Sequence, residues 1–235
     1  MKNIQIIISV FLYIMIQASL NAQIRTPELD KQAEIIEPVG FNPSRSYPLL
    51  VIVPPTTMTT RNYYNYYLRH ENFDNVLIML LPGTYYSGDY LPNFAGFVGW
   101  FNEMFQREFD KVFNNYKIDM NKISICGYSL GGDLTWALNA LNPDLFCGIH
   151  VGGSRCSYPV SANNLAKMRS RGFRAAFYMG GSDSSARING NKNARDLMNN
   201  SGIEVRYEES AGSNHENIAD QYFTINLKWI TGTNE

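Results

Sequence analysis

The sequence predicts a single α/β domain, in which a mostly parallel β-sheet carries helices on both faces as a three-layer sandwich. Two observations lead to this prediction. Apolar runs of strand length alternate along the chain with longer stretches whose apolar residues recur at helical spacing, a pattern typical of a parallel sheet covered on both sides. The chain of 235 residues is also ample for one hydrophobic core and short for two. We expect the domain to span residues 37–235.

The N-terminal segment is expected to lie outside this domain. Lys2 supplies a positive charge, residues 4–16 are mainly apolar, and the small residues that end at Ala22 suit a cleavage site. The apolar run is shorter than the roughly 20 residues that cross a bilayer. We therefore predict a signal peptide over residues 1–22, a polar leader over residues 23–36, and a secreted or periplasmic protein without a stable membrane anchor.

The first half of the domain is predicted from its apolar patterns. Residues 49–53 and 76–81 are apolar runs of strand length, and the tyrosine-rich stretch 61–73 between them predicts a helix. Residues 101–116 then predict a long helix with one core-facing stripe. The side chains of this stripe are Phe101, Met104, Phe105, Phe109, Val112, Phe113 and Tyr116.

The sequence Gly-Tyr-Ser-Leu-Gly-Gly at residues 127–132 joins a predicted strand (122–126) to a predicted helix (130–141). In this setting Gly-x-Ser-x-Gly forms a sharp turn that exposes the serine hydroxyl, and its glycines remove side chains that would clash. The N–H groups and the positive end of the following helix suit an oxyanion. Ser129 is therefore the candidate nucleophile. The alternative interpretation is an ordinary Gly/Ser loop between a strand and a helix.

A serine hydroxyl needs a base to become a good nucleophile, and histidine is the usual one. Two of the three histidines are more simply interpreted as packed or surface residues, because His70 lies in the tyrosine-rich stretch and His150 in an apolar run. His215 lies in a Gly/Ser loop between a predicted strand (203–208) and a predicted helix (217–230). A loop histidine can reach over the serine, so His215 is the candidate base.

The acid that orients the histidine is expected between Ser129 and His215 in the chain. Residues 146–151 and 175–179 predict two more strands, and Asp183 follows the second one in Gly-Gly-Ser-Asp. Open α/β sheets place site residues at the carboxyl ends of their strands, so Asp183 is the candidate acid. The other carboxylates nearby are interpreted as a first-turn helix residue or as surface charges; they are Asp133, Asp220, Glu208 and Glu209.

These motifs resemble esterases of the polyhydroxybutyrate depolymerase and feruloyl or acetylxylan esterase type, within the α/β-hydrolase superfamily. The segments that carry the resemblance are residues 37–53, 127–132, 142–146 and 180–183. The resemblance covers about residues 37–230 and implies an α/β-hydrolase fold with Ser129, Asp183 and His215 as nucleophile, acid and base. Related enzymes often insert a cap where residues 152–172 lie. This connection is short here, and we expect no large cap domain.

The expected oxyanion hole departs from the pattern of these esterases. They usually carry His-Gly after the strand that corresponds to residues 49–53, whereas Pro54 and Pro55 stand here. Proline has no N–H to donate. The next residue, Thr56, corresponds to the usual donor and keeps both an N–H and a hydroxyl. We predict that Thr56 and the N–H of Leu130 form the hole.

Three tyrosines are candidate substrate contacts. Tyr85, Tyr86 and Tyr90 lie in a glycine-containing loop that follows the predicted strand 76–81 on the expected side of the site. Aromatic surfaces suit sugar rings or aromatic acyl groups. Packing against the rest of the fold is the alternative interpretation.

Composition and cysteine usage exclude other classes. The formal net charge of −1 gives no basic excess for nucleic acid. The sequence has no Cys/His spacing typical of zinc and no glycine-rich phosphate loop, so we expect neither a metal nor a cofactor. Cys126 is expected to be buried. Whether Cys147 and Cys156 pair in an oxidising compartment stays open, because a strand that starts at Cys147 carries the chain away.

Taken together, the residues and the resemblance predict a secreted serine esterase that cleaves carboxylic esters through an acyl-enzyme. Its expected partner is an ester substrate such as an acetyl or feruloyl group on a polysaccharide. Two alternatives stay open. A serine peptidase uses the same three residues, and a catalytically weak binding protein of this fold is suggested by Pro54 and Pro55.

Overall fold

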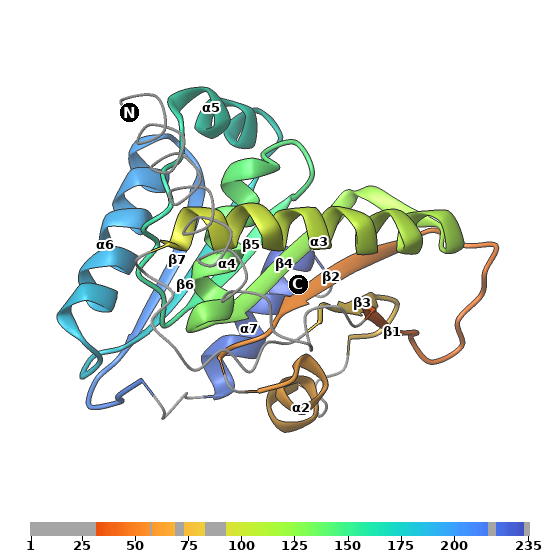
Figure 1. The fold of residues 1–235 in the computed structure, drawn as a ribbon, viewed down its shortest axis with the longest axis horizontal. Coiled ribbons are helices and arrows are strands. Elements are labelled where there is room, and N and C mark those ends of the chain that lie inside the picture. Colours follow the sequence, from red (N-terminus) through yellow and green to blue (C-terminus); the bar gives the residue numbers. More distant parts are fainter. Residues whose placement is uncertain (1–31, 57, 69–72, 83–92, 216–219, 233–235) are drawn as a thin grey trace, which may run out of the picture.

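The computed structural model describes residues 32–56, 58–68, 73–82, 93–215 and 220–232. Seven strands form one sheet in the order β1-β3-β2-β4-β5-β6-β7 (Figure 1). All neighbouring strands are parallel except β1, which pairs antiparallel with β3. The strands are β1 Glu34–Ile36, β2 Tyr47–Val53, β3 Leu77–Leu80, β4 Ile118–Tyr128, β5 Gly148–Gly152, β6 Arg174–Gly180 and β7 Glu204–Ser210. The helices are α2 Thr60–Tyr63, the π-helix η2 Tyr64–Leu68, α3 Phe94–Asn115, α4 Leu130–Leu141, α5 Ala162–Ser170, α6 Ser185–Asn200 and α7 Asp220–Thr231.

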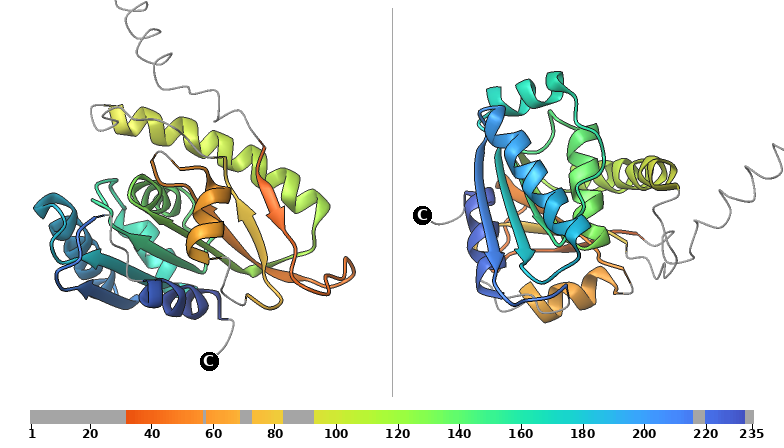
Figure 2. Two further views of the ribbon diagram at one scale, coloured as in Figure 1. Left: turned by 90° about the horizontal axis from the view of Figure 1, so that it is seen from below. Right: turned by 90° about the vertical axis from the view of Figure 1, so that its left-hand side faces the viewer.

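Both faces of the sheet are covered, and β2 shows why. Residues 49–53 are all fully buried, with alternate side chains pointing to opposite faces. Leu49, Val51 and Val53 join the larger core cluster, which includes side chains of α3, α4, α5 and α6. Leu50 and Ile52 join the smaller cluster with side chains of α2, η2 and α7. Figure 2 shows α3 and α4 on one side of the sheet and α7 on the other. The predicted three-layer α/β fold is confirmed.

Several predicted boundaries shift. Helix α3 begins at Phe94, about two turns before the predicted start, because Phe97 and Val98 extend its buried stripe. Strand β4 is longer than predicted at both ends. The predicted helix 61–73 is a four-residue α-helix followed by a π-helix, and residues 69–72 lie outside the described part of the chain. The connection from β5 to β6 contains α5 alone among regular elements, which agrees with the absence of a large cap in the described ranges.

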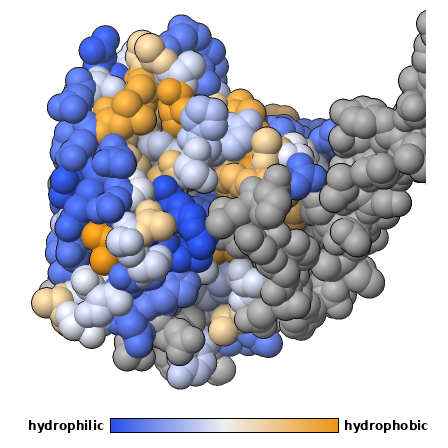
Figure 3. Space-filling view, turned by 60° about the vertical axis from the view of Figure 1, so that its left-hand side comes forward, coloured by the Kyte–Doolittle hydropathy of each residue, from blue (hydrophilic) through white to orange (hydrophobic). Residues whose placement is uncertain are grey.

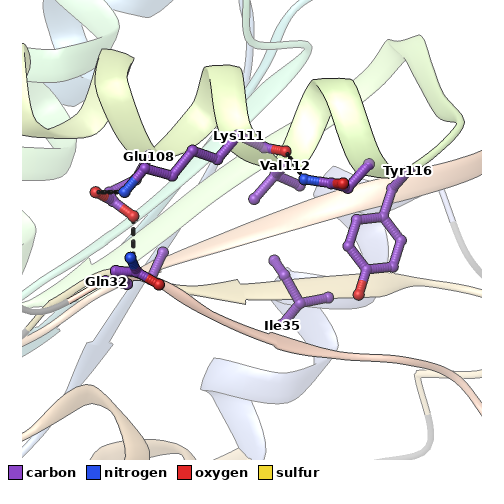
Figure 4. Close-up of a pocket in the computed structure, with 8 residues that line it drawn as sticks. Gln32, Ile35, Glu108, Lys111, Val112 and Tyr116 are labelled. Atoms are coloured by element: carbon purple, nitrogen blue, oxygen red, sulfur yellow. Dashed lines mark hydrogen bonds and ion pairs between the residues drawn. The ribbon is translucent and has the colours of Figure 1, made fainter.

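The sheet also includes residues that the sequence places in the polar leader. Strand β1 pairs with β3. Ala33, the residue just before β1, donates its N–H to the carboxylate of Glu108 in α3 at 3.0 Å. Burial of Glu108 opposes its ionisation, but hydrogen bonds from Lys111, the Ala33 N–H and Arg107 hold the pKa of its carboxyl below the ordinary value. A pocket of about 230 Å³ lies beside this contact, between β1 and α3 (Figure 4). None of the candidate catalytic residues lines it.

Six large hydrophobic side chains are exposed among the described residues. Figure 3 shows hydrophobic side chains in small groups among hydrophilic ones on the side of the molecule near α6. The large hydrophobic side chains that are exposed come from separate parts of the chain; they are Val39, Tyr66, Phe113, Met120, Leu141 and Leu197. Scattered exposure of this kind is normal for a globular domain. No helix of the described residues is long and apolar enough to span a bilayer.

The cysteines do not pair. Cys126 is buried in β4 as expected, and Cys147 and Cys156 are both free thiols. Cys147 lies just before β5, with its sulfur 3.3 Å from the Ser124 hydroxyl oxygen. Cys156 lies in the loop that follows β5, where its N–H donates to Ser154 Oγ. Strand β5 lies between the two residues along the chain.

Candidate active site

Ser129 lies on a strained turn between β4 and α4. Its backbone angles, φ 58° and ψ −121°, are unfavourable for a residue with a side chain. The surrounding glycines make this turn possible. A Cβ on Gly127 would lie 2.3 Å from the Gly131 carbonyl oxygen, and a Cβ on Gly131 would lie 2.5 Å from the Val53 carbonyl oxygen. The turn therefore needs glycine at both positions, as the elbow motif predicts.

The backbone around Ser129 is held by its neighbours. The Ser129 N–H donates to the Gly152 carbonyl at 2.9 Å, and the Ser129 carbonyl accepts the Asp133 N–H at 3.0 Å. These bonds join the turn to the end of β5 on one side and to the first turn of α4 on the other. The serine is therefore fixed by two elements, which a free Gly/Ser loop would not provide.

The structure brings the three candidate side chains into one hydrogen-bonded chain. His215 Nε2 lies 2.8 Å from Ser129 Oγ, and His215 Nδ1 lies 2.6 Å from Asp183 Oδ2. The other oxygen of Asp183 accepts the Ser184 N–H at 2.6 Å. The side chain of Asp183 is only 3% exposed, whereas that of His215 is 31% exposed. The acid is thus buried behind the imidazole, and the imidazole faces both the serine and solvent.

Two loops at the carboxyl edge of the sheet bring the candidate acid and the candidate base together. Asp183 follows β6, and His215 follows β7, which pairs with β6 in parallel. The Ser182 N–H donates to the Ser213 carbonyl at 2.8 Å, which ties the two loops directly. Gly180 allows the close approach, since a Cβ there would lie 2.6 Å from the Ser213 carbonyl oxygen.

Asp133 has a structural role that its sequence position alone does not show. Its carboxylate is 1% exposed, and its Oδ1 accepts the Ser154 hydroxyl at 2.7 Å and the Arg155 N–H at 2.8 Å. The Arg155 guanidinium also lies 3.6 Å from Oδ2. A buried carboxylate with these partners is satisfied. Asp133 thereby connects α4 to the loop that directly follows Gly152, the residue whose carbonyl accepts the Ser129 N–H.

The predicted oxyanion residues lie at the same edge of the sheet as Ser129. Strands β2 and β4 pair in parallel with Val53 opposite Gly127, so Thr56 and Ser129 both follow that register point. The Pro54 carbonyl carbon would lie 3.0 Å from a Cβ on Gly131, so the chain after β2 passes directly against the first turn of α4. Leu130 is the first residue of α4, where N–H groups have no partner within the helix.

Thr59 and Thr60, which follow Thr56 along the chain, make hydrogen bonds to other groups. The Thr59 hydroxyl caps α2 by accepting the Asn62 N–H at 3.2 Å, and the Thr60 hydroxyl donates to the Leu81 carbonyl. Thr56 is partly exposed. The assignment of the second oxyanion donor to Thr56 stays a prediction.

Other candidates from the sequence fall outside the described residues. They are the signal peptide at 1–22, His70, and the three loop tyrosines Tyr85, Tyr86 and Tyr90. No group of three or more His, Cys, Asp or Glu side chains that could hold a metal ion occurs in the described part of the chain.

His150 is not part of the hydrogen-bonded chain of Asp183, His215 and Ser129. It is fully buried in β5, with its backbone paired opposite Cys126 and Ala176. Burial lowers the pKa of His150 from 6.5 to about 3. His150 is therefore a neutral core residue, which agrees with the simpler interpretation from the sequence.

The lowered pKa of His150 predicts a pH-dependent stability. Between about pH 3 and pH 6.5 the unfolded chain binds a proton at this residue and the folded chain does not. The free energy of unfolding should therefore fall as the pH drops through this window, by at most about 1.4 kcal/mol per pH unit. His150→Gln removes this titration, and urea unfolding at pH 4 to 7 should show a shallower slope than the wild type. The carboxylates are common to both proteins, so equal slopes would contradict the prediction.

Comparisons with known proteins give the class of the fold. No protein-family model matches the chain, and no curated protein matches it. Solved structures do match. A thermostable esterase superposes with a TM-score of 0.60 at 18% identity, covering 84% of this chain and 58% of that one, less than two thirds of its length. A CE1 ferulic acid esterase from Anaeromyces mucronatus, in complex with ferulic acid, has a TM-score of 0.62 at 15% identity. The match covers 88% of this chain and 87% of that one. Porphyromonas gingivalis dipeptidyl peptidase 4 has a TM-score of 0.59 at 15% identity. The match covers 84% of this chain and 33% of that one.

These likenesses show the fold. The chain has the α/β-hydrolase fold, and its structural neighbours include esterases and peptidases. A shared fold does not fix the substrate, which depends on the chemistry of the site.

Proposed function

We propose that this protein is a serine hydrolase that cleaves carboxylic esters through an acyl-enzyme. The observation that carries the proposal is the hydrogen-bonded chain from Asp183 through His215 to Ser129, with the serine on a strained, glycine-flanked turn. A buried acid, a partly exposed imidazole and a presented hydroxyl match the requirements of nucleophilic acyl transfer.

In the proposed reaction Ser129 Oγ attacks the ester carbonyl carbon and its proton passes to His215 Nε2. The tetrahedral intermediate then expels the alcohol, which takes the proton from Nε2, and the acyl group stays on Ser129. Water attacks the acyl-enzyme with His215 again as the base, and the carboxylic acid leaves. Asp183 accepts the Nδ1–H throughout, which holds the tautomer and stabilises the imidazolium.

The substrate class we propose is an acetyl or feruloyl ester on a polysaccharide. The ferulic acid esterase among the structural neighbours supports this class. So do the predicted signal peptide, which would export the protein to the periplasm or medium, and the predicted aromatic loop. We also propose that the protein works without a metal or cofactor, since the acyl-transfer steps need only the three side chains and two oxyanion donors.

A serine peptidase is the second candidate, because a dipeptidyl peptidase shares the fold. The third is a catalytically weak binding protein, motivated by Pro54 and Pro55 after β2. One set of measurements separates the three. The protein is incubated with a fluorophosphonate, and peptide mass spectrometry locates the label, while turnover is measured on p-nitrophenyl acetate, methyl ferulate, acetylated xylan and a dipeptidyl p-nitroanilide.

An esterase should be labelled at Ser129 and should turn over the esters faster than the anilide. A peptidase should be labelled at the same residue with the anilide as the better substrate. Absence of both label and turnover would favour the binding protein. A label at another serine would contradict the proposed nucleophile.

A further inference from the structure

Tyr128, the residue before Ser129, contacts His215 in two ways. Its hydroxyl donates a hydrogen bond of 2.7 Å to the backbone carbonyl oxygen of His215. Its ring lies beside the imidazole, with centroids 5.3 Å apart and planes inclined by 31°. The tyrosine is 4% exposed, so both contacts are made largely out of water. Tyr128 thus contacts His215, the candidate base for the neighbouring Ser129.

The neighbourhood is shaped to hold this tyrosine in place. A Cβ on Gly152 would lie 2.6 Å from Tyr128 Cδ2, and a Cβ on Gly153 would lie 2.7 Å from Tyr128 Cζ. Gly153 also has a φ of +53°, which favours glycine. Two successive glycines at the end of β5 therefore leave room for the Tyr128 ring. Any residue with a Cβ at either position would displace the ring.

Two of the hydrogen bonds that hold the backbone of the loop carrying His215 come from the segments that carry Asp183 and Ser129. The Ser213 carbonyl accepts the Ser182 N–H at 2.8 Å, which ties the loop to the segment that carries Asp183. The His215 carbonyl accepts the Tyr128 hydroxyl, which ties the loop to the strand end that carries Ser129. The two attachments therefore set the backbone of His215 relative to both of the groups that its imidazole must reach.

We propose that Tyr128 is a positioning residue for His215. Its hydroxyl holds the His215 carbonyl so that the imidazole spans Asp183 Oδ2 and Ser129 Oγ at hydrogen-bond distance from each. The inference rests on the proposed function, because positioning matters only if His215 transfers the proton of Ser129. Small displacements of a catalytic group are costly, since proton transfer needs short and aligned contacts.

The test is Tyr128→Phe, which removes the hydroxyl and keeps the ring. With p-nitrophenyl acetate, kcat should fall by about tenfold while KM changes by less than about twofold, because alignment and not substrate binding is lost. The matched control is Tyr47→Phe. Tyr47 is also buried and its hydroxyl accepts the Asn42 N–H at 2.8 Å, but it lies at the start of β2, the opposite edge of the sheet from Ser129. This control should leave kcat unchanged.

A double-mutant cycle separates positioning from a general structural role. In the His215→Ala background there is no imidazole to orient, so adding Tyr128→Phe should change the residual rate by less than about twofold. If Tyr128→Phe lowers the rate by the same factor in both backgrounds, or leaves kcat of the wild type unchanged, the proposal is overturned. The proposed function fails on separate results, such as an intact esterase activity in Ser129→Ala or His215→Ala alone, or a fluorophosphonate label at another serine.

Discussion

Ser129→Ala is expected to lower kcat for ester hydrolysis by roughly 10⁴–10⁶-fold. The change removes the hydroxyl that lies 2.8 Å from His215 Nε2 and leaves the strained turn in place. His215→Ala should have an effect of similar size, and combining the two should add little, because both residues act in the same step. Steady-state kinetics with p-nitrophenyl acetate on the single and double variants measure this. Ser170→Ala is a suitable control, since that exposed hydroxyl donates to the Lys167 carbonyl on α5.

Asp183→Asn tests the third member separately. The amide can hold the wrong tautomer of His215, and the expected loss in kcat is about 10⁴-fold. If this variant folds and keeps its activity within a few-fold of the wild type, the acid is misassigned. Glu209 is a poor substitute, because its carboxylate is already held by Lys192 at 2.9 Å and by the Tyr207 hydroxyl at 2.9 Å. Glu208 would then be tested next.

Thr56→Pro is expected to lower kcat by about 10²–10³-fold, the usual cost of losing one oxyanion donor. Pro54 and Pro55 cannot donate, and the change would remove both the N–H and the hydroxyl of Thr56. The fixed φ of the two prolines stiffens the approach to Thr56, so the natural sequence presents this donor in a restricted geometry. Kinetics together with circular dichroism distinguish loss of a donor from loss of the fold.

Two further variants locate the donor. Thr56→Val removes the hydroxyl and keeps the N–H, so a rate close to that of the wild type would assign the N–H. Thr59→Val serves as the control, because it removes the α2 cap and should lower stability by about 1 kcal/mol without changing kcat. A Thr56→Pro protein that folds and keeps nearly full activity would show that Thr56 is not part of the hole.

The long-range polar contacts of the site could not be inferred from sequence. The sequence predicts that Asp133 is a first-turn helix residue. In the structure its carboxylate also accepts hydrogen bonds from Ser154 and Arg155, in the loop after β5. Tyr128 was only the variable position of the elbow, and its contact with His215 depends on how the loop after β7 folds back. The one local signal was the pair Gly152 and Gly153, which makes room for the tyrosine ring.

Two helices were also missed because their sequences carry weak patterns. α6 has only three buried residues, Asn191, Ala194 and Met198, and its remaining residues are largely polar. It is held instead by contacts with residues distant in the sequence. Asn191 donates to the Ser154 carbonyl, and Gly190 packs against the Arg155 backbone. α5 is nine residues long and buries two of them. Periodicity fails when tertiary contacts and not an apolar stripe stabilise a helix.

The sequence by itself was enough to predict the alternating core and the sharp turn at Ser129, and to single out Asp183 and His215 as the candidate acid and base. Each depends on local chemistry or on order along the chain: buried strands are continuous apolar runs, the turn needs its own glycines, and parallel strands end at one edge. The tertiary structure alone decided the distances from Ser129 to His215 and from His215 to Asp183, the π-helix after α2, and the partners of Asp133 and Tyr128. Hydrogen bonds between residues distant in the chain form only where packing brings their backbones together, and no local pattern encodes that approach.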